Sequence, residues 1–247
     1  MKSDASENAG LDPSKLPAHV AVIMDGNGRW AKKRMLNRVK GHERGADTVR
    51  LVVRTSREIG IRYLTLYAFS TENWQRPEAE ISALMTLLKR FLASEKQEMV
   101  ENNIRLNTIG ETDRLPADVR KALAQSKEAT GANDGMCLTL ALSYGGRAEI
   151  ARAAREIAEA VKEGRMDPQE VTPQRLAEYM YTAQVPDPEL LIRTSGEFRV
   201  SNFLLWQIAY TEIFVTPTLW PEFTRDEYIE ILRDFGKRER RFGRIMS

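Results

Sequence analysis

Short apolar runs alternate with longer amphipathic segments along most of this chain of 247 residues. Runs with strand character occupy residues 19–24, 63–69, 104–109, 136–142, 190–192 and 208–215. Apolar side chains recur at helical spacing over residues 45–59, 78–102, 116–129, 147–163, 172–181 and 224–241. Strands that alternate with helices form βαβ units. The pattern therefore predicts an α/β fold: a single domain with a mostly parallel central sheet of about six strands surrounded by helices.

The composition and the chain ends narrow this prediction. Residues 1–18 are polar and lack the apolar stretch of a signal peptide, so we expect a flexible N-terminal tail followed by one domain over residues 19–247. No run approaches ~18 apolar residues, so we expect no membrane-spanning helix. The single cysteine, Cys137, fits a reducing, cytoplasmic compartment. A net charge of +2 gives no indication of a nucleic-acid partner.

Polar segments follow four of the expected strands. They are residues 25–30, 70–74, 143–146 and 193–196, and three of the four contain glycine. In a parallel sheet the carboxyl ends of the strands share one edge, and ligands bind beyond that edge. The sequence therefore predicts that these segments converge on one site.

The first of these segments, from Asp25 to Trp30, combines a carboxylate, two glycines and an arginine. Asp25 is a candidate ligand for Mg²⁺, which prefers one or two carboxylates together with phosphate oxygens and water. Glycines allow the backbone N–H groups to approach an anion, and Arg29 can fork onto a phosphate. A tight turn with an Asx cap explains the same residues without a ligand.

Many basic residues lie in and after this segment, and they favour a polyphosphate site. They include Arg29, Arg38 and His42, although a charge run is more often a solvated face. His42 lies beside Gly41, where it can face a ligand, whereas His19 begins a strand and is expected to be structural.

The remaining strand ends offer a second anion site. Residues 70–76 carry hydroxyl, amide and guanidinium groups, but they also suit the cap of a helix that starts near Pro77. Arg193 and Arg199 flank a Ser-Gly turn and are candidates for binding an anion there. The alternative is that they form ion pairs at the surface. Glu212 falls within an apolar segment, so it is expected to bind a metal or to pair with a core arginine.

Together these segments resemble the cis-prenyltransferase family. The matching strings are HVAVIMDGNGRWAKKR, LTLYAFSTENWQRP, SYGGR, LIRTSGE followed by SNFLLWQIAYTE, and RERRFG, and they extend from His19 to Gly243. The resemblance implies a fold of cis-prenyltransferase type. It also implies an enzyme that condenses isopentenyl diphosphate repeatedly onto farnesyl diphosphate, each step leaving a cis double bond. In bacterial members the product is undecaprenyl diphosphate, the precursor of a lipid carrier for cell-wall polysaccharide.

The resemblance also implies roles for individual residues. Asp25 would be the essential carboxylate and Mg²⁺ ligand, with help from Glu212, and Asn73 would be the candidate proton acceptor. Because a neutral amide is a poor base, our hypothesis is that Asn73 orients while a diphosphate oxygen or Asp25 takes the proton. The implied substrate-binding residues are Gly26, Asn27, Gly28, Arg29, Trp30, Arg38, His42, Ser70, Thr71, Glu72, Trp74, Arg76, Arg193, Arg199, Val200 and Ser201.

Further expectations concern assembly and location. The resemblance implies a homodimer in which Arg241, Phe242 and Gly243 reach the neighbouring subunit's isopentenyl diphosphate site. The basic C-terminal helix could contact anionic lipid at the inner face of the membrane during product release. The growing product needs a dry channel, and we expect Met136 at its floor.

Two positions depart from the family, and several readings stay open. Phe198 stands where some members have a histidine, and Ser195 stands where glycine is common.

A cis-prenyltransferase of another product length is the alternative within the family. A non-catalytic partner subunit is disfavoured because such subunits lose the carboxylate that Asp25 supplies. A diphosphate-binding adaptor at the membrane surface is the alternative from another class of protein.

Overall fold

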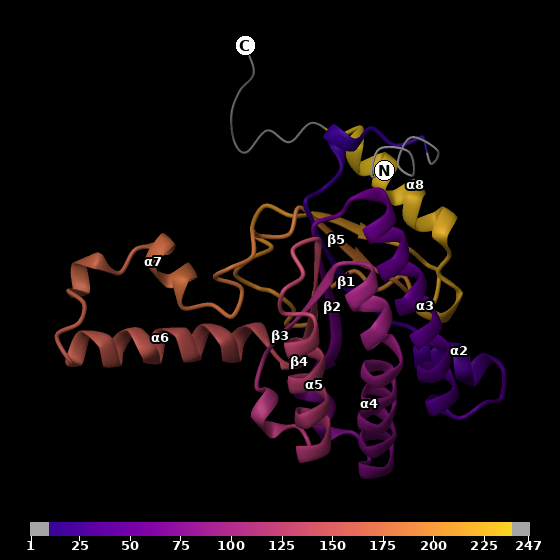
Figure 1. Ribbon diagram of the computed structural model, residues 1–247, viewed down its shortest axis with the longest axis horizontal. Helices are drawn as coiled ribbons and strands as arrows, with labels where there is room; N and C mark the ends of the chain where they lie inside the picture. The colour runs from indigo at the N-terminus through magenta and orange to yellow at the C-terminus, as the bar shows by residue number, and fades with distance from the viewer. Residues whose placement is uncertain (1–9, 239–247) are drawn as a thin grey trace.

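The computed structural model describes residues 10–238, and these build one parallel sheet of six strands. The strand order is β3-β4-β2-β1-β5-β6, and every neighbouring pair is parallel (Figure 1). The bounds are β1 His19–Ile23, β2 Tyr63–Ser70, β3 Ile104–Ile109, β4 Met136–Tyr144, β5 Leu190–Arg193 and β6 Glu212–Val215. The predicted fold class is confirmed.

The helices follow the predicted alternation, with differences at their ends. They are α2 Asn27–Lys33, α3 Arg38–Ile59, α4 Glu78–Glu101, α5 Ala117–Ala129, α6 Gly146–Lys162, α7 Pro173–Glu178 and α8 Arg225–Gly236. Single 3-10 turns lie at η1 Pro13–Lys15, η2 Thr71–Gln75, η3 Thr112–Arg114, η4 Pro168–Glu170 and η5 Trp220–Glu222. Helix α3 begins at Arg38 rather than at residue 45, because the Asn37 side chain caps it by accepting from Lys40 N.

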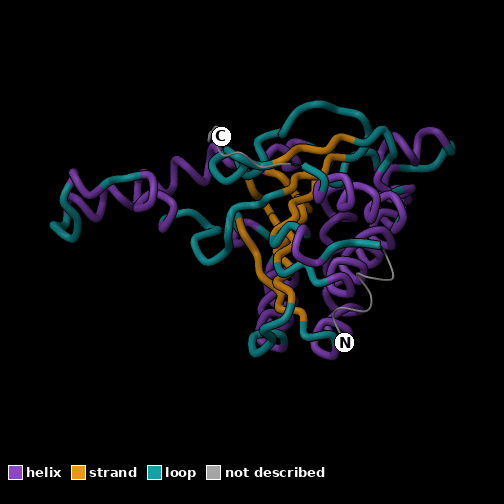
Figure 2. The backbone as a smooth tube through the Cα atoms, turned by 90° about the horizontal axis from the view of Figure 1, so that it is seen from above, coloured by secondary structure: helices purple, strands orange, loops and turns teal. Residues whose placement is uncertain are grey.

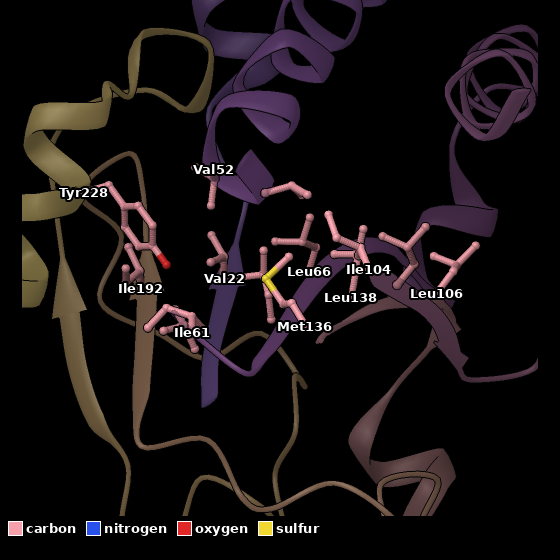
Figure 3. Packing of buried hydrophobic residues seen from close by; sticks show 14 of the residues in the cluster. Val22, Val52, Ile61, Leu66, Ile104, Leu106, Met136, Leu138, Ile192 and Tyr228 are labelled. Carbon is pink, nitrogen blue, oxygen red and sulfur yellow. The ribbon is translucent and has the colours of Figure 1, made fainter. Parts of the chain in front are cut away.

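The two faces of the sheet are covered differently. Val20 and Val22 of β1 join a large core with α3, α4, α5 and α8, and Figure 3 shows part of it around Val22, Val52, Leu66 and Tyr228. Ala21 and Ile23 point to the opposite face. There they pack with buried Phe203 and Leu204, which belong to the segment after β5.

Helices α6 and α7 form an arm that projects from the sheet (Figures 1 and 2). A small cluster of Ile157, Ala160 and Met166 holds this arm together. At its base, buried Glu149 accepts from the Tyr144 hydroxyl and, at 2.8 Å, from Tyr181 N. The arm is thus fixed to the sheet at one end only.

One expectation differs from the described structure. Part of the expected N-terminal tail is packed: Leu11 is buried in the main core, and the Asp12 side chain caps η1. Met136 begins β4, at the end of the strand away from the predicted site, and it is a core residue (Figure 3). Within residues 10–238, no helix has the length and apolar character needed to cross a membrane.

His19 is structural, as expected. Its Nδ1 lies 2.6 Å from the carbonyl oxygen of Pro186, and its Nε2 lies 2.8 Å from the Thr65 hydroxyl. Since a carbonyl only accepts, Nδ1 carries the proton. Burial lowers the pKa of His19 to about 4, so the ring is neutral at physiological pH.

Candidate active site

Asp25 lies just beyond the carboxyl end of β1, beside the end of β5. Strands β1 and β5 are neighbours with Ile23 opposite Arg193, which brings Asp25 close to that arginine. The Asp25 carboxylate accepts a hydrogen bond from Arg193 at 2.8 Å and lies 3.1 Å from Nη2 of Arg29. Arg193 is almost fully buried, with only 4% of its surface exposed.

Opposing effects act on the pKa of Asp25. Burial alone would raise it, but the hydrogen bond from Arg193 and the charges of Arg29 and Arg193 outweigh burial and lower the pKa. Asp25 is therefore ionised at neutral pH and is a weak base. When a phosphate group binds, its oxygens can replace the Asp25 carboxylate as partners of the two guanidinium groups. The ionised carboxylate then suits a metal that arrives with the phosphate.

The segment after Asp25 is the first turn of a helix rather than an isolated turn. Gly26 has φ +112, which favours glycine, and α2 begins at Asn27. Helix α3 packs closely against this start: a Cβ on Gly41 would lie 2.1 Å from the Asn27 carbonyl oxygen. A Cβ on Gly45 would lie 2.3 Å from the Asn27 side-chain oxygen. These two glycines therefore allow α2 and α3 to meet beside Asp25.

Three basic side chains converge around Glu80 of α4. Arg76 lies 3.1 Å and Arg38 lies 3.4 Å from its carboxylate oxygens, and Nε2 of His42 lies 3.8 Å away. Burial, reinforced by the nearby charge of Arg76, lowers the pKa of His42 to about 4. His42 is therefore neutral at pH 7 and can donate a hydrogen bond to an anion.

The turn after β2 is both a cap and part of the site. Asn73 Oδ1 accepts from Ser70 N at 3.2 Å in a capping box for η2. This leaves the Asn73 amide nitrogen as the atom available to a ligand. The expected cap of the helix after Pro77 is not formed, because α4 has no side-chain cap at its start. Trp74 donates to the Ser143 hydroxyl at 2.9 Å and packs edge-on against Phe69.

The loop after β5 joins the two expected anion sites. Arg193 Nη1 donates to the Ser201 hydroxyl at 2.8 Å. The Glu197 carboxylate lies 2.8 Å from Arg29 and 2.5 Å from Arg199. Ser195 has φ +78, a left-handed conformation in which glycine would be unstrained.

A cavity of about 620 Å³ connects these groups to the interior. Its polar end is lined by Asp25, Asn27, His42, Ser70, Glu72, Asn73, Arg76, Arg193 and Ser201. Its apolar end is lined by Val49, Leu66, Leu84, Met85, Leu87, Leu88, Phe91, Leu140 and Leu142, from α3, α4, β2 and β4. The volume is in the usual range of about 300–1,000 Å³ for ligand sites. Charged and polar side chains on one part of the wall and apolar side chains on the rest suit a molecule with a charged head and a long apolar tail.

Comparison with known proteins decides the family. The prenyltransferase family profile, described as "Putative undecaprenyl diphosphate synthase", matches residues 23–243. This chain belongs to that family.

Relatives within the undecaprenyl diphosphate synthase family match along nearly the whole chain. Isoprenyl transferase of Geobacter sulfurreducens is 54% identical over 238 residues, covering 96% of this chain and 97% of the relative. Isoprenyl transferase of Bacillus subtilis is 48% identical over 231 residues, covering 94% and 89%. The chain is therefore a prenyltransferase of the type that elongates prenyl chains in cis.

Two solved structures share the fold. Lavandulyl diphosphate synthase from Lavandula x intermedia, in complex with dimethylallyl diphosphate, has a TM-score of 0.91 at 35% identity and covers 93% of this chain and 99% of its own. A probable undecaprenyl diphosphate synthase from Campylobacter jejuni has a TM-score of 0.76 at 36% identity, covering 92% and 99%.

Some of the expected site residues of this family member lie outside the cavity lining. The expected substrate-binding residues that do not line the cavity are Gly26, Gly28, Arg29, Trp30, Arg38, Thr71, Trp74, Arg199 and Val200. Trp30 lies under the Arg34 guanidinium, whose carbon is 4.5 Å from the ring centre. Phe198 is 85% exposed and points away from the core.

Glu212 is not brought to Asp25. It is the first residue of β6, paired in register with Leu190 at the start of β5, and it forms an ion pair with Arg238. In a parallel sheet this places Glu212 at the amino edge, whereas Asp25 is at the carboxyl edge. Within this chain Glu212 therefore does not lie beside Asp25, and its expected help in binding Mg²⁺ stays a prediction. Within residues 10–238, no group of three or more acidic, histidine or cysteine side chains is arranged to hold a metal.

The sequence analysis missed several residues that shape the site. Glu80 organises three basic side chains, and its only sequence signal was the spacing of four residues from Arg76. Gly45, Trp220 and Asn202 also line the cavity. Met136 does not line it, since the β4 residues that do are Leu140 and Leu142.

Proposed function

We propose that this chain condenses isopentenyl diphosphate repeatedly onto farnesyl diphosphate, in the presence of Mg²⁺, to give undecaprenyl diphosphate. That product would serve as the precursor of the lipid carrier for peptidoglycan synthesis in the cytoplasm. The observation that carries the proposal is the cavity itself, in which Asp25, Arg193, His42 and Arg76 lie at the mouth of an apolar channel between the sheet and helix α4.

Each condensation makes and breaks a defined set of bonds. The C–O bond of the allylic diphosphate breaks as C1 bonds to C4 of isopentenyl diphosphate, and a proton leaves C2 of the incoming unit. Negative charge develops on the departing diphosphate, where Arg29, Arg76 and the neutral His42 can stabilise it. Arg193, Arg199 and Ser201 would hold the second diphosphate, and alignment of the two substrates supplies the entropic advantage.

The structure favours one of the two proton acceptors considered. Asp25 is held by two guanidinium groups that lower its pKa, so it is a weaker base than a free carboxylate. We therefore assign the proton to a diphosphate oxygen, with Asn73 orienting the reacting carbons. Asn73→Asp should not greatly raise turnover, and a large increase would show that residue 73 itself takes the proton.

Mg²⁺ fits this site as a metal bound with substrate. Asp25 would hold it together with diphosphate oxygens and water, and the metal would neutralise charge on the leaving group. Free Mg²⁺ fits less well, because both Asp25 partners are cations.

We also propose a homodimer and peripheral membrane contact during product release. Arg241, Phe242 and Gly243, which are expected to reach the neighbouring site, lie outside the described residues. Size-exclusion chromatography with light scattering tests the dimer. Sedimentation with anionic vesicles tests the membrane contact.

The decisive experiment is incubation with farnesyl diphosphate and labelled isopentenyl diphosphate. The wild type should incorporate label, and both a chelator and Asp25→Ala should abolish incorporation. Reversed-phase chromatography of the products separates undecaprenyl from shorter or longer chains. Absence of chelator-sensitive incorporation would overturn the proposal in favour of a non-catalytic diphosphate-binding protein.

A further inference from the structure

Asn202 joins three segments that are far apart in the sequence. Its side-chain oxygen accepts from Arg147 N at 2.9 Å, and its side-chain nitrogen donates to the Glu72 carboxylate at 2.8 Å. Its carbonyl oxygen accepts from Gly146 N at 2.7 Å. One residue of the loop after β5 therefore contacts the start of α6 and the turn that contains Asn73.

The start of α6 depends on Asn202 for its cap. The first N–H groups of a helix have no partner within the helix. The local N-cap residue is Gly145, which has no side chain to supply one. A Cβ at Gly145 would lie 2.6 Å from the Thr71 hydroxyl and 2.8 Å from the Asn202 amide nitrogen. Gly145 and Gly146 of the SYGGR string thus permit close backbone contact. The cap of α6 comes from Asn202, which lies 55 positions from Arg147 in the sequence.

The loop around Asn202 is held in an unfavourable backbone conformation. Ser201, Asn202 and Leu204 have φ values of +47, +62 and +47. This left-handed region strains a residue other than glycine, and asparagine less than serine or leucine. The buried side chains of Phe203 and Leu204 hold the loop in place. Such conformations persist only where the surroundings fix them, and they cluster at functional sites.

Asn202 also lies between two parts of the reaction site. Ser201, next to it, accepts from Arg193, while Glu72 is adjacent to Asn73. Ser201, Asn202, Glu72 and Asn73 all line the same cavity. The contact between Asn202 and Glu72 therefore sets the spacing between the isopentenyl diphosphate loop and the turn beside the reacting carbons.

We propose that Asn202 is a positioning residue for the condensation, an inference that rests on the proposed function. Anchored to the start of α6, it holds Glu72 and so keeps isopentenyl diphosphate in register with the allylic substrate. A misplacement of reacting groups by ~1 Å can cost about a hundredfold in rate. A residue that merely capped α6 would affect stability and would leave the kinetic constants of the folded enzyme unchanged.

The test reverses the polarity of this contact. Asn202→Asp keeps an oxygen for Arg147 N but sets a carboxylate against Glu72. Because hydrogen bonds to charged groups contribute about 1.5–3 kcal/mol, turnover should fall on the order of tenfold to a hundredfold. We expect the KM for isopentenyl diphosphate to rise, with a smaller change for farnesyl diphosphate.

The double variant Asn202→Asp, Glu72→Gln restores the contact, because the glutamine amide can donate to the new aspartate. It should be about tenfold more active than Asn202→Asp alone, a coupling that independent sites would not show. Glu72→Ala tests the same contact from the other side and leaves the α6 cap intact. It should raise the KM for isopentenyl diphosphate in the same selective way. It replaces Asn202→Asp as the test variant if Asn202→Asp does not fold.

The outcomes separate the two proposals. A wild type that incorporates no label overturns the proposed function, and this inference with it. An active wild type with a fully active Asn202→Asp, or a double variant no better than the single one, overturns only the positioning role. Circular dichroism and melting temperature establish that each variant is folded before its kinetics are compared.

Discussion

The carboxylate of Asp25 accepts a hydrogen bond from the buried guanidinium of Arg193 at 2.8 Å, linking the residue beyond β1 to the last residue of β5. The same guanidinium contacts the Ser201 hydroxyl. Its Nε has no hydrogen-bond partner among residues 10–238. Arg193 therefore depends on Asp25 for its charge balance.

Replacing Asp25 by asparagine should be costly for stability. Breaking a buried ion pair from one side leaves the other charge uncompensated, so the free energy of unfolding should fall by about 3 kcal/mol. Added inorganic diphosphate should recover part of this loss by binding Arg193 and Arg29. Urea unfolding with and without diphosphate measures both effects.

Asp47→Asn is the matched control. Asp47 pairs with Arg44 and Arg50, but its side chain is 54% exposed, and such pairs contribute roughly 0–1 kcal/mol. An Asp25 variant no less stable than the Asp47 variant would contradict the assigned role of the buried pair.

Removing the Glu197 carboxylate should strengthen substrate binding. In the chain without substrate, Glu197 occupies both Arg29 and Arg199, one from each expected diphosphate site. Glu197→Gln frees both guanidinium groups, so we expect the KM values for both diphosphates to fall several-fold with little change in melting temperature. Glu222→Gln, which frees only Arg34, should leave KM unchanged. A raised KM in the Glu197 variant would instead show that this carboxylate helps to bind substrate.

Filling the apolar channel should shorten the product. Leu88 lines the cavity from α4, and a larger side chain there would occupy space needed by the growing chain. Leu88→Trp should shift the products to shorter chains on reversed-phase chromatography. Val100→Trp is the control on the same helix, because Val100 is 38% exposed and lies outside the cavity lining. Unchanged product length in the Leu88 variant would place the growing chain elsewhere.

Met136 remains a separate prediction. It shares a face of β4 with Leu140, but the cavity does not reach it. Met136→Ala should lengthen the product by enlarging the space that the growing chain can enter, and unchanged product length on reversed-phase chromatography would contradict this expectation.

The two histidines should make the protein sensitive to acid. His19 and His42 have folded pKa values of about 4, against 6.5 when unfolded, so between these values the unfolded chain binds more protons. Their contribution to stability is therefore present above pH 6.5 and lost as the pH falls towards 4. It amounts to about 3 kcal/mol for each histidine.

Urea unfolding at several pH values tests this expectation. His42→Gln should reduce the slope of stability against pH below 6.5, because one of the two titrating histidines is removed while the carboxylates still contribute. An identical slope in the variant would mean that His42 is not kept neutral by its surroundings.

Short-range pattern was sufficient to predict much of this protein. The alternation of strands and helices requires a parallel sheet, and a parallel sheet brings the residues after β1, β2 and β5 to one edge. For this reason the sequence alone predicts that Asp25, Asn73 and Arg193 lie together. Helix α2 could not be predicted, because seven residues with an internal glycine show too little periodicity, and its position depends on contact with Gly41 and Gly45.

Only the tertiary structure decided how segments remote in sequence meet. The apolar run over residues 208–215 indicated a strand, which forms only over Glu212–Val215. The register with Leu190 determined that Glu212 lies at the edge away from Asp25. Likewise, no local signal relates Asn202 to Glu72 and Arg147. Periodicity along a chain fixes which face of an element is buried, whereas the order and register of strands depend on the packing of all elements at once.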